Sequence, residues 1–199
     1  MSGRGAWLWL LLAVIALSGC RSPDGEYRYA MKLVLSGNSA SGARMLTGLA
    51  MTGHAPSQLR LGLLYRLGKG VPRDLRRAAH WFERAADQGD VGGQYWLAEA
   101  YGRGDGVPAS PERPFQWFHR LAERGYAPAQ ERIARAYATG QGVPHDDRQA
   151  VVWLERAAKG GHHDAALRLA FAYRNGLLGL PRDSEQADAW EQANQLPRF

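Results

Sequence analysis

The sequence predicts an all-α protein in which short helical hairpins stack into a right-handed α-solenoid. Shifting the 199-residue chain by about 36 residues brings the same residue types into register several times. The residues that follow this period are Tyr29, Tyr65, Tyr101, Tyr137 and Tyr173; Gly53, Gly89, Gly125 and Gly161; and Trp81, Trp117 and Trp153, with Trp190 one residue late. A period of roughly 20–50 residues with two helices per unit is typical of hairpins that bury their apolar faces against their neighbours.

The segment 129–161 shows most clearly how one unit is built. The apolar residues that share one face of its first helix are Ala129, Ile133, Ala134 and Tyr137. The loop Gly140–Pro144 ends this helix, because glycine accepts a positive φ and proline cannot continue the hydrogen-bond ladder. Asp146 is placed to cap the second helix. The apolar face of that second helix is formed by Ala150, Trp153, Leu154, Ala157 and Ala158. The corresponding N-cap positions elsewhere are Asn38, Asp74, Ser110 and Asp183.

Residues 1–19 predict a signal peptide. Arg4 precedes an apolar run of 12 residues, which is too short to span a bilayer. The following Leu17-Ser18-Gly19-Cys20 resembles the lipoprotein box of bacteria, whose cysteine becomes the first residue and carries acyl chains such as palmitate. Cys20 is the only cysteine and therefore has no disulfide partner. The alternative is an ordinary signal peptide followed by a chance cysteine.

The resemblance to lipoproteins implies a chain anchored by lipid at Cys20 and facing the periplasm. Arg21 after the cysteine, in place of aspartate, favours the outer over the inner membrane of a Gram-negative cell. The organisation expected for the remainder is a lipidated cysteine and tether at 20–25, a degenerate N-terminal hairpin at 26–54, and four full units at 55–90, 91–126, 127–162 and 163–196.

The chain is basic, with a formal net charge of +6 that falls to +5 when Arg4 is removed with the signal peptide. An exported protein does not meet nucleic acid, and the basic residues are interspersed with acidic ones along the helices. We therefore exclude nucleic acid and expect an acidic protein surface, anionic lipid or an anionic polymer as the partner.

The repeated pattern resembles the Sel1-like repeat. The first full unit carries the matching residues Leu61-Gly62, Tyr65, Gly68, Gly70-Val71-Pro72, Asp74, Ala78, Trp81, Ala85-Ala86 and Gly89. The related tetratricopeptide repeat is the alternative, but its unit is about 34 residues long and lacks the Gly-x-Gly-Val-Pro loop. The resemblance implies an adaptor that binds proteins and is monomeric when free.

Motifs for catalysis, cofactors or metals are not found. The chain has no His-Glu-x-x-His pair, no Gly-x-Ser-x-Gly elbow and no phosphate loop, and one cysteine cannot build a thiolate metal site. The pair His162-His163 falls at a turn between units, and the glycine-rich segment 102–106 is the inter-helix loop of its unit. We therefore expect no enzyme and no cofactor other than the covalent lipid on Cys20.

Partner-binding residues are expected where the repeats differ. One position of the first helix reads Arg60, Trp96, Arg132 and Arg168 across the four full units, and first helices of such hairpins generally line the concave face. Arginine and tryptophan are enriched in interface hot spots, and guanidinium groups suit carboxylates. Further aromatic residues that break the pattern are Tyr95, Phe115 and Phe171. The alternative is that Trp96 packs between units and the arginines are solvated.

The resemblance leaves three functions open. A short, lipid-anchored Sel1-like protein is similar to immunity lipoproteins that neutralise a phospholipase-type effector delivered by type VI secretion, and this function is favoured by the shortness of the array. A scaffold for envelope assembly or polysaccharide export is the alternative, and a cell-wall hydrolase is the remote one.

Overall fold

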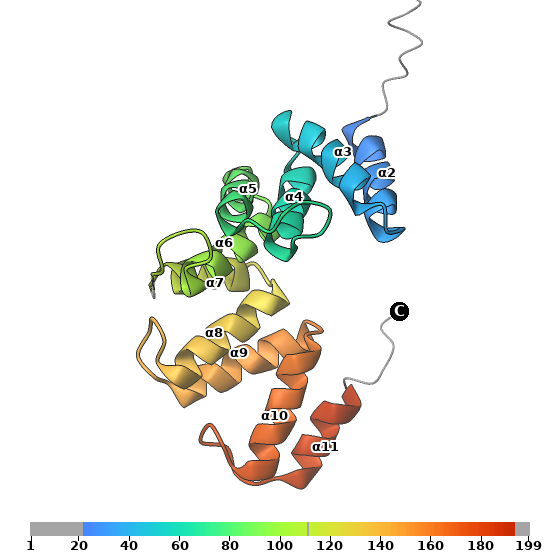
Figure 1. The fold of residues 1–199 in the computed structure, drawn as a ribbon. Coiled ribbons are helices and arrows are strands. Elements are labelled where there is room, and N and C mark those ends of the chain that lie inside the picture. The colour runs from blue at the N-terminus through green and yellow to red at the C-terminus, as the bar shows by residue number, and fades with distance from the viewer. Residues whose placement is uncertain (1–21, 111, 194–199) are drawn as a thin grey trace, which may run out of the picture. The chain divides into compact units, whose positions relative to one another are not determined.

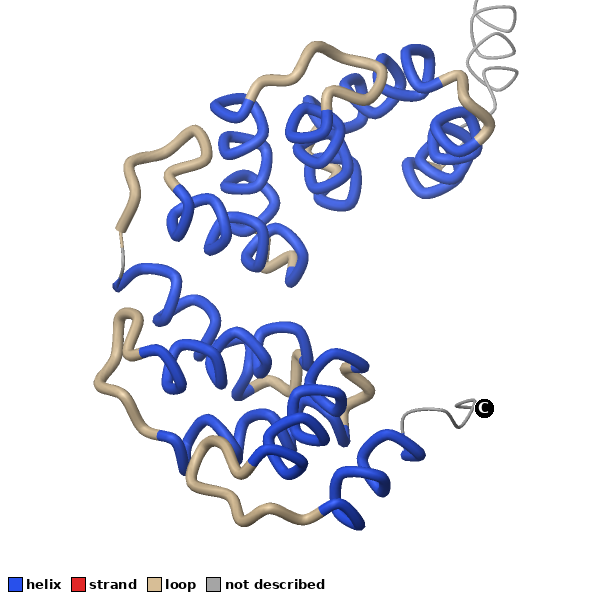
Figure 2. Tube along the Cα trace, turned by 60° about the horizontal axis from the view of Figure 1, so that its bottom comes forward, coloured by secondary structure: helices blue, strands red, loops and turns tan. Residues whose placement is uncertain are grey.

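The computed structural model describes residues 22–110 and 112–193, and within these ranges it contains helices and loops but no strand (Figures 1 and 2). The helices are α2 (Pro23–Leu35), α3 (Ser39–Met51), α4 (Ala55–Leu67), α5 (Leu75–Asp87), α6 (Val91–Arg103), α7 (Glu112–Glu123), α8 (Ala127–Thr139), α9 (Asp147–Lys159), α10 (His163–Asn175) and α11 (Ser184–Ala193). The predicted all-α class is thereby confirmed. The signal peptide and the lipidation at Cys20 lie outside the described residues.

The chain divides into two compact units, Met1–Arg73 and Asp74–Phe199. In the first unit α2 packs on α3 and α3 on α4. In the second unit each helix from α5 to α11 packs on the next one along the chain. Helices that pack mainly on their sequence neighbours form the one-dimensional array that the period predicts. Among the helices described, none is long and apolar enough to cross a bilayer.

The predicted N-caps are present, with one exception. Side-chain oxygens of Asp74, Asp146 and Asp183 accept a hydrogen bond from the backbone N–H three residues later, each at 3.0 Å. The Ser110 hydroxyl does the same at 3.3 Å. Asn38 stands at the N-cap of α3, but its side chain makes no capping bond.

The first helix begins earlier than the sequence predicts. Ser22 caps α2 by accepting from the N–H of Gly25, and Pro23 occupies the first helical position, where a missing N–H costs nothing. Residues 23–25, predicted as part of the tether, therefore belong to the helix.

The second glycine of two inter-helix loops, Gly70 and Gly106, lies against the preceding repeat. Gly106 has φ +79°, and a Cβ atom there would overlap with the Leu75 carbonyl at the start of α5. Gly70 stands in the same relation to Ser39 at the start of α3. A side chain at either position would push the loop away from the helix on which it rests, so the Gly-x-Gly pattern reflects packing between repeats as well as turn geometry.

Repeats are also joined by a series of glutamine side chains that the sequence analysis did not single out. The amides of Gln58 and Gln130 donate to the carbonyls of Ala50 and Ala122, at 3.0 and 3.1 Å. Gln94 reaches the Ala86 carbonyl at 3.4 Å. Each carbonyl lies in the last turn of the preceding helix and also accepts from the N–H of the glycine three residues later, so the glutamine adds a second hydrogen bond that links the repeats.

The tryptophans that follow the period divide into two pairs. Trp81 and Trp153 are buried, as predicted for core residues. Trp117 and Trp190 are only partly buried against the core cluster. The guanidinium of Arg120 lies over the Trp117 ring at 5.7 Å, and Trp190 lies on α11, the last helix described. We therefore expect the full cost of truncation at Trp153 and a smaller one at Trp117.

Candidate functional site

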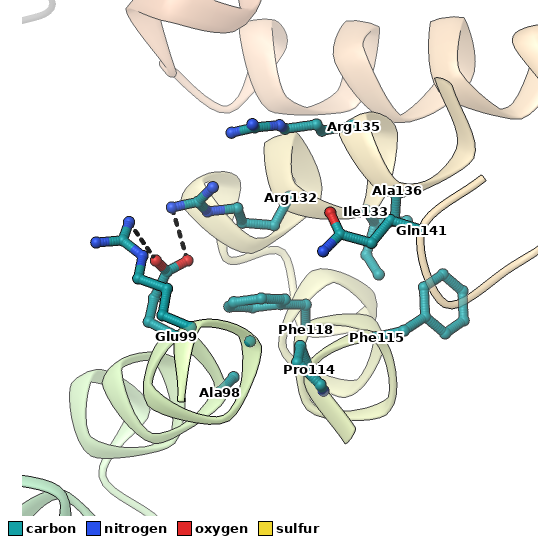
Figure 3. A pocket seen from close by; sticks show the side chains of 12 residues that line it. Ala98, Glu99, Pro114, Phe115, Phe118, Arg132, Ile133, Arg135, Ala136 and Gln141 are labelled. Atoms are coloured by element: carbon teal, nitrogen blue, oxygen red, sulfur yellow. Dashed lines mark ion pairs between the residues drawn. The ribbon is translucent and has the colours of Figure 1, made fainter. Parts of the chain in front are cut away.

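The helices α6, α8 and α10 are the first helices of three successive repeats, and we call the surface that they form the first-helix face. It contains two grooves. Groove A lies between α6 and α8, has a volume of about 230 Å³ and is shown in Figure 3. Groove B lies between α8 and α10, has a volume of about 540 Å³ and is bordered by the loop after α10.

Groove A is organised around the buried carboxylate of Glu99. Its two oxygens lie 2.8 Å from a guanidinium nitrogen of Arg103 on the same helix and 2.7 Å from one of Arg132 on α8 (Figure 3). The Nε of Arg132 also donates to the Tyr95 hydroxyl at 3.3 Å. Burial lowers the pKa of Arg132, but the hydrogen bond with Tyr95 and the charge of Glu99 outweigh it and raise the pKa above its usual value. Groove A thus holds a fixed network of charges.

The next repeat carries a weaker version of this pairing. Arg168 on α10 lies 3.2 Å from the buried carboxylate of Glu131 on α8, and about half of the Arg168 side chain is exposed. Both arginines of the predicted stripe in this unit are therefore neutralised by a glutamate of the preceding repeat. They are neither free cations nor simply solvated.

The other two members of the stripe have different surroundings. Trp96 is half-buried, with its ring stacked on Phe82 at 6.1 Å between centroids and edge-on to Tyr95 at 5.5 Å. Arg60 lies in α4 of the first unit, where its Nε is buried without a hydrogen-bond partner. The structure thus brings Arg132 and Arg168 into repeating positions on one face. That these residues bind a partner stays a prediction.

The three additional aromatic residues also differ. Tyr95 and Phe115 are partly buried against the core cluster, and the Phe115 ring contacts Tyr137 edge-on at 5.7 Å. Phe171 is 60% exposed and lines groove B. Of the three, only Phe171 is mostly exposed.

Groove B is mostly apolar. Leu167, Phe171 and Leu177, all exposed, line it together with Leu154 and Leu178. Such an exposed group of large apolar side chains is unusual on a surface that has no binding role. This groove is the part of the face that most resembles a binding site.

Arg135 is not among the site residues predicted from the sequence, yet it lies between the two grooves and lines both. Its guanidinium is exposed and extends from α8 toward the same side as Arg132 (Figure 3). Among the described residues no carboxylate pairs with it. A signal for it exists in the sequence, because the position three residues after Arg132 also differs among the repeats. The four repeats have Leu63, Glu99, Arg135 and Phe171 there.

One arrangement in the first unit resembles a catalytic triad. His54 contacts the Ser57 hydroxyl through Nδ1 at 2.8 Å and the Asp24 carboxylate through Nε2 at 3.1 Å. A nucleophile must reach its substrate, but Ser57 is fully buried at the start of α4, whereas Asp24 is exposed. The cluster joins α2 to α4 and does not form an active site. Within the described residues, no cluster of three potential metal ligands occurs.

Comparisons with known proteins agree with this architecture. The family model described as the Sel1 repeat matches residues 55–90, 91–126, 127–162 and 163–190. A Sel1 repeat protein from Oxalobacter formigenes is 26% identical, with a TM-score of 0.81 over 89% of this chain and 72% of its own. No protein of curated function matches the sequence.

Two further solved structures are similar. The protein c5321, a protective antigen of uropathogenic Escherichia coli with an SLR fold, is 27% identical, with a TM-score of 0.74 over 86% of this chain and 38% of its own. A Sel1 repeat protein from Klebsiella pneumoniae is 18% identical, with a TM-score of 0.58 over 86% and 85%, a likeness that concerns the fold alone.

Proposed function

The chain belongs to the Sel1 repeat family, and from this and the first-helix face we propose that it is a non-catalytic, protein-binding lipoprotein of the periplasm. Sel1 repeats form a protein-binding fold. The observation that carries the proposal is the combination of the exposed apolar groove B with the unpaired cation Arg135 at its edge. Exposed groups of apolar side chains mark interaction sites, and arginine is enriched in interface hot spots.

The proposed location rests on the lipoprotein box that ends at Cys20. Several acyl chains on one residue give a stable membrane anchor, whereas a single chain gives only marginal binding. We expect metabolic labelling with palmitate to mark the full chain and the label to be lost in Cys20→Ser. Fractionation should place the wild-type chain in the outer membrane. A labelled Cys20→Ser chain, or a wild-type chain without label, would contradict the anchor.

The proposed role is that of an immunity protein for a phospholipase-type effector delivered into the periplasm by type VI secretion. The support is the shortness of the array and the expected anchor, which would hold a stoichiometric inhibitor beside the membrane that such an effector attacks. The basic net charge suits a partner with an acidic surface. The role does not require catalysis by this chain.

A genetic experiment tests this role. Deleting the gene should arrest growth only while the cognate effector is produced, and the purified chain should inhibit that effector at equimolar ratio. Growth arrest that persists without the effector, accompanied by a defect in envelope assembly or polysaccharide export, would instead support the scaffold function. Hydrolysis of cell-wall material by the purified chain would overturn the non-catalytic assignment.

A further inference from the structure

Grooves A and B are the same inter-repeat groove, one repeat apart, with different side chains. Adding 36 to the residue numbers of groove A gives most of the residues that line groove B: the positions of Glu99, Arg132 and Gln141 become those of Arg135, Arg168 and Leu177. The two sites therefore share a backbone framework, and groove A serves as an internal reference for what groove B has gained and lost.

Groove A contains its own anion. The carboxylate of Glu99 lies between Arg103 and Arg132 and neutralises the cation that the next repeat supplies. Groove B has Arg135 at the position of this carboxylate, and Thr139 at the position of Arg103. At this one position groove B therefore has a cation where groove A has an anion, although groove B keeps the carboxylate of Glu131.

The remaining charges of groove B do not compensate this exchange. Arg168 is already bound to Glu131, so that the pair contributes no net charge at the rim. Arg135 is left exposed, with no carboxylate partner among the described residues. An anion from outside the chain would give Arg135 the kind of carboxylate partner that Arg132 has in Glu99 and Arg168 has in Glu131.

Two further positions are polar in groove A and apolar in groove B. Phe171 occupies in groove B the position that Arg135 occupies in groove A, and Leu177 occupies the position of Gln141. Both side chains are exposed beside Leu167. Groove B, in which these polar side chains are replaced by apolar ones, is also larger, at about 540 Å³ against about 230 Å³ for groove A.

We propose that groove B binds a segment of a partner protein that inserts one large apolar side chain between Leu167, Phe171 and Leu177 and places a neighbouring aspartate or glutamate on Arg135. The inference rests on the proposed protein-binding function and names the chemistry of the segment that is bound. A planar guanidinium binds a carboxylate through two parallel hydrogen bonds, and this fixes the register of the segment in the groove.

A peptide selection tests the proposal directly. The full chain is used to select from a phage-displayed library of random dodecapeptides, and one enriched peptide is synthesised with a fluorophore and titrated by fluorescence anisotropy. Enriched sequences should combine phenylalanine, leucine or tryptophan with an acidic residue within a few positions. Absence of enrichment, or enrichment of peptides without an acidic residue, would overturn the proposal.

Two groove variants and one matched control locate the peptide. Arg135→Glu recreates the carboxylate of groove A and should weaken binding at least tenfold, as should Phe171→Ser, which removes the apolar contact. Arg148→Glu makes the same charge change at an exposed position of α9 outside both grooves and should leave affinity within twofold of wild type. Both groove residues are exposed, and circular dichroism should show unchanged helix content. Equal binding by wild type and both groove variants would place the peptide elsewhere.

Two outcomes separate this inference from the proposed function. An effector that is neutralised equally well by wild type, Arg135→Glu and Phe171→Ser would leave the immunity role standing and remove groove B from it. Specific binding of the acidic and apolar peptide, without neutralisation of any effector, would retain the groove and refute the role. Displacement of the peptide by myristate at lower concentration than by unlabelled peptide would assign the groove to a lipid chain and overturn the proposal.

Discussion

Replacing Glu99 by glutamine should destabilise the protein more than the same change at Glu131, although both residues are buried glutamates of the first-helix face. The Glu99 side chain is 8% exposed, and its partner Arg132 is 22% exposed. Removing one charge of a fully buried pair costs about 3–5 kcal/mol, because the other charge is left without compensation. Arg132 keeps some contact with water and its bond to Tyr95. We therefore expect a loss of about 2 kcal/mol.

Glu131→Gln is the matched control. Its partner Arg168 is 54% exposed and can be solvated when the pair is broken, so the loss should be at most about 1 kcal/mol. For a domain of this size about 1 kcal/mol corresponds to roughly 2–4 °C in Tm, so Glu99→Gln should lower Tm by about 4–8 °C. Thermal unfolding followed by circular dichroism at 222 nm measures both variants. A Tm loss for Glu99→Gln no larger than that for Glu131→Gln would refute the assignment of groove A as a stabilising network.

Three further predictions concern the array itself. Trp153→Ala should cost about 3–5 kcal/mol in denaturant unfolding, because the ring is buried in the core cluster, and an unchanged midpoint would contradict this. Gln130→Ala should cost about 1 kcal/mol by removing one of the two hydrogen bonds that the Ala122 carbonyl accepts, and faster amide hydrogen exchange at the end of α7 would report it. Gly106→Ala should destabilise the packing of its loop on Leu75 and lower Tm, whereas an unchanged Tm would show that the loop can move away without loss.

The sequence was sufficient for the fold because the determinants of the fold recur with the period. Asp74 and Asp146 cap equivalent helices, and Trp81 and Trp153 are buried at equivalent positions. Each such residue acts within its own hairpin or on the adjacent one, so its role can be inferred from spacing. The glutamine series represented by Gln130 also recurs, and its role could have been predicted by asking what satisfies the last carbonyls of each second helix.

The candidate site was harder to predict because it depends on which carboxylate reaches which arginine. Spacing identifies Arg132 and Arg168 as equivalent positions, but spacing alone does not show that Glu99 and Glu131 lie against them. The two glutamates do not occupy equivalent positions of their repeats. The residue equivalent to Glu131 in the preceding repeat is Tyr95, and Glu99 lies one helical turn after Tyr95. Only the three-dimensional arrangement distinguishes a paired arginine from the unpaired Arg135.

This distinction determines how partner binding on the first-helix face can be tested. Reversing the charge of Arg132 would place two carboxylates together in groove A, so that loss of binding could result from loss of structure. Arg135 extends from the same helix but takes part in no ion pair among the described residues, so its reversal changes the charge of the surface without breaking such a pair. The ion pair of Arg132 and the proposed partner contact of Arg135 are thus three residues apart on α8, so a variant at Arg135 tests the proposed binding while the ion pair of Arg132 is kept.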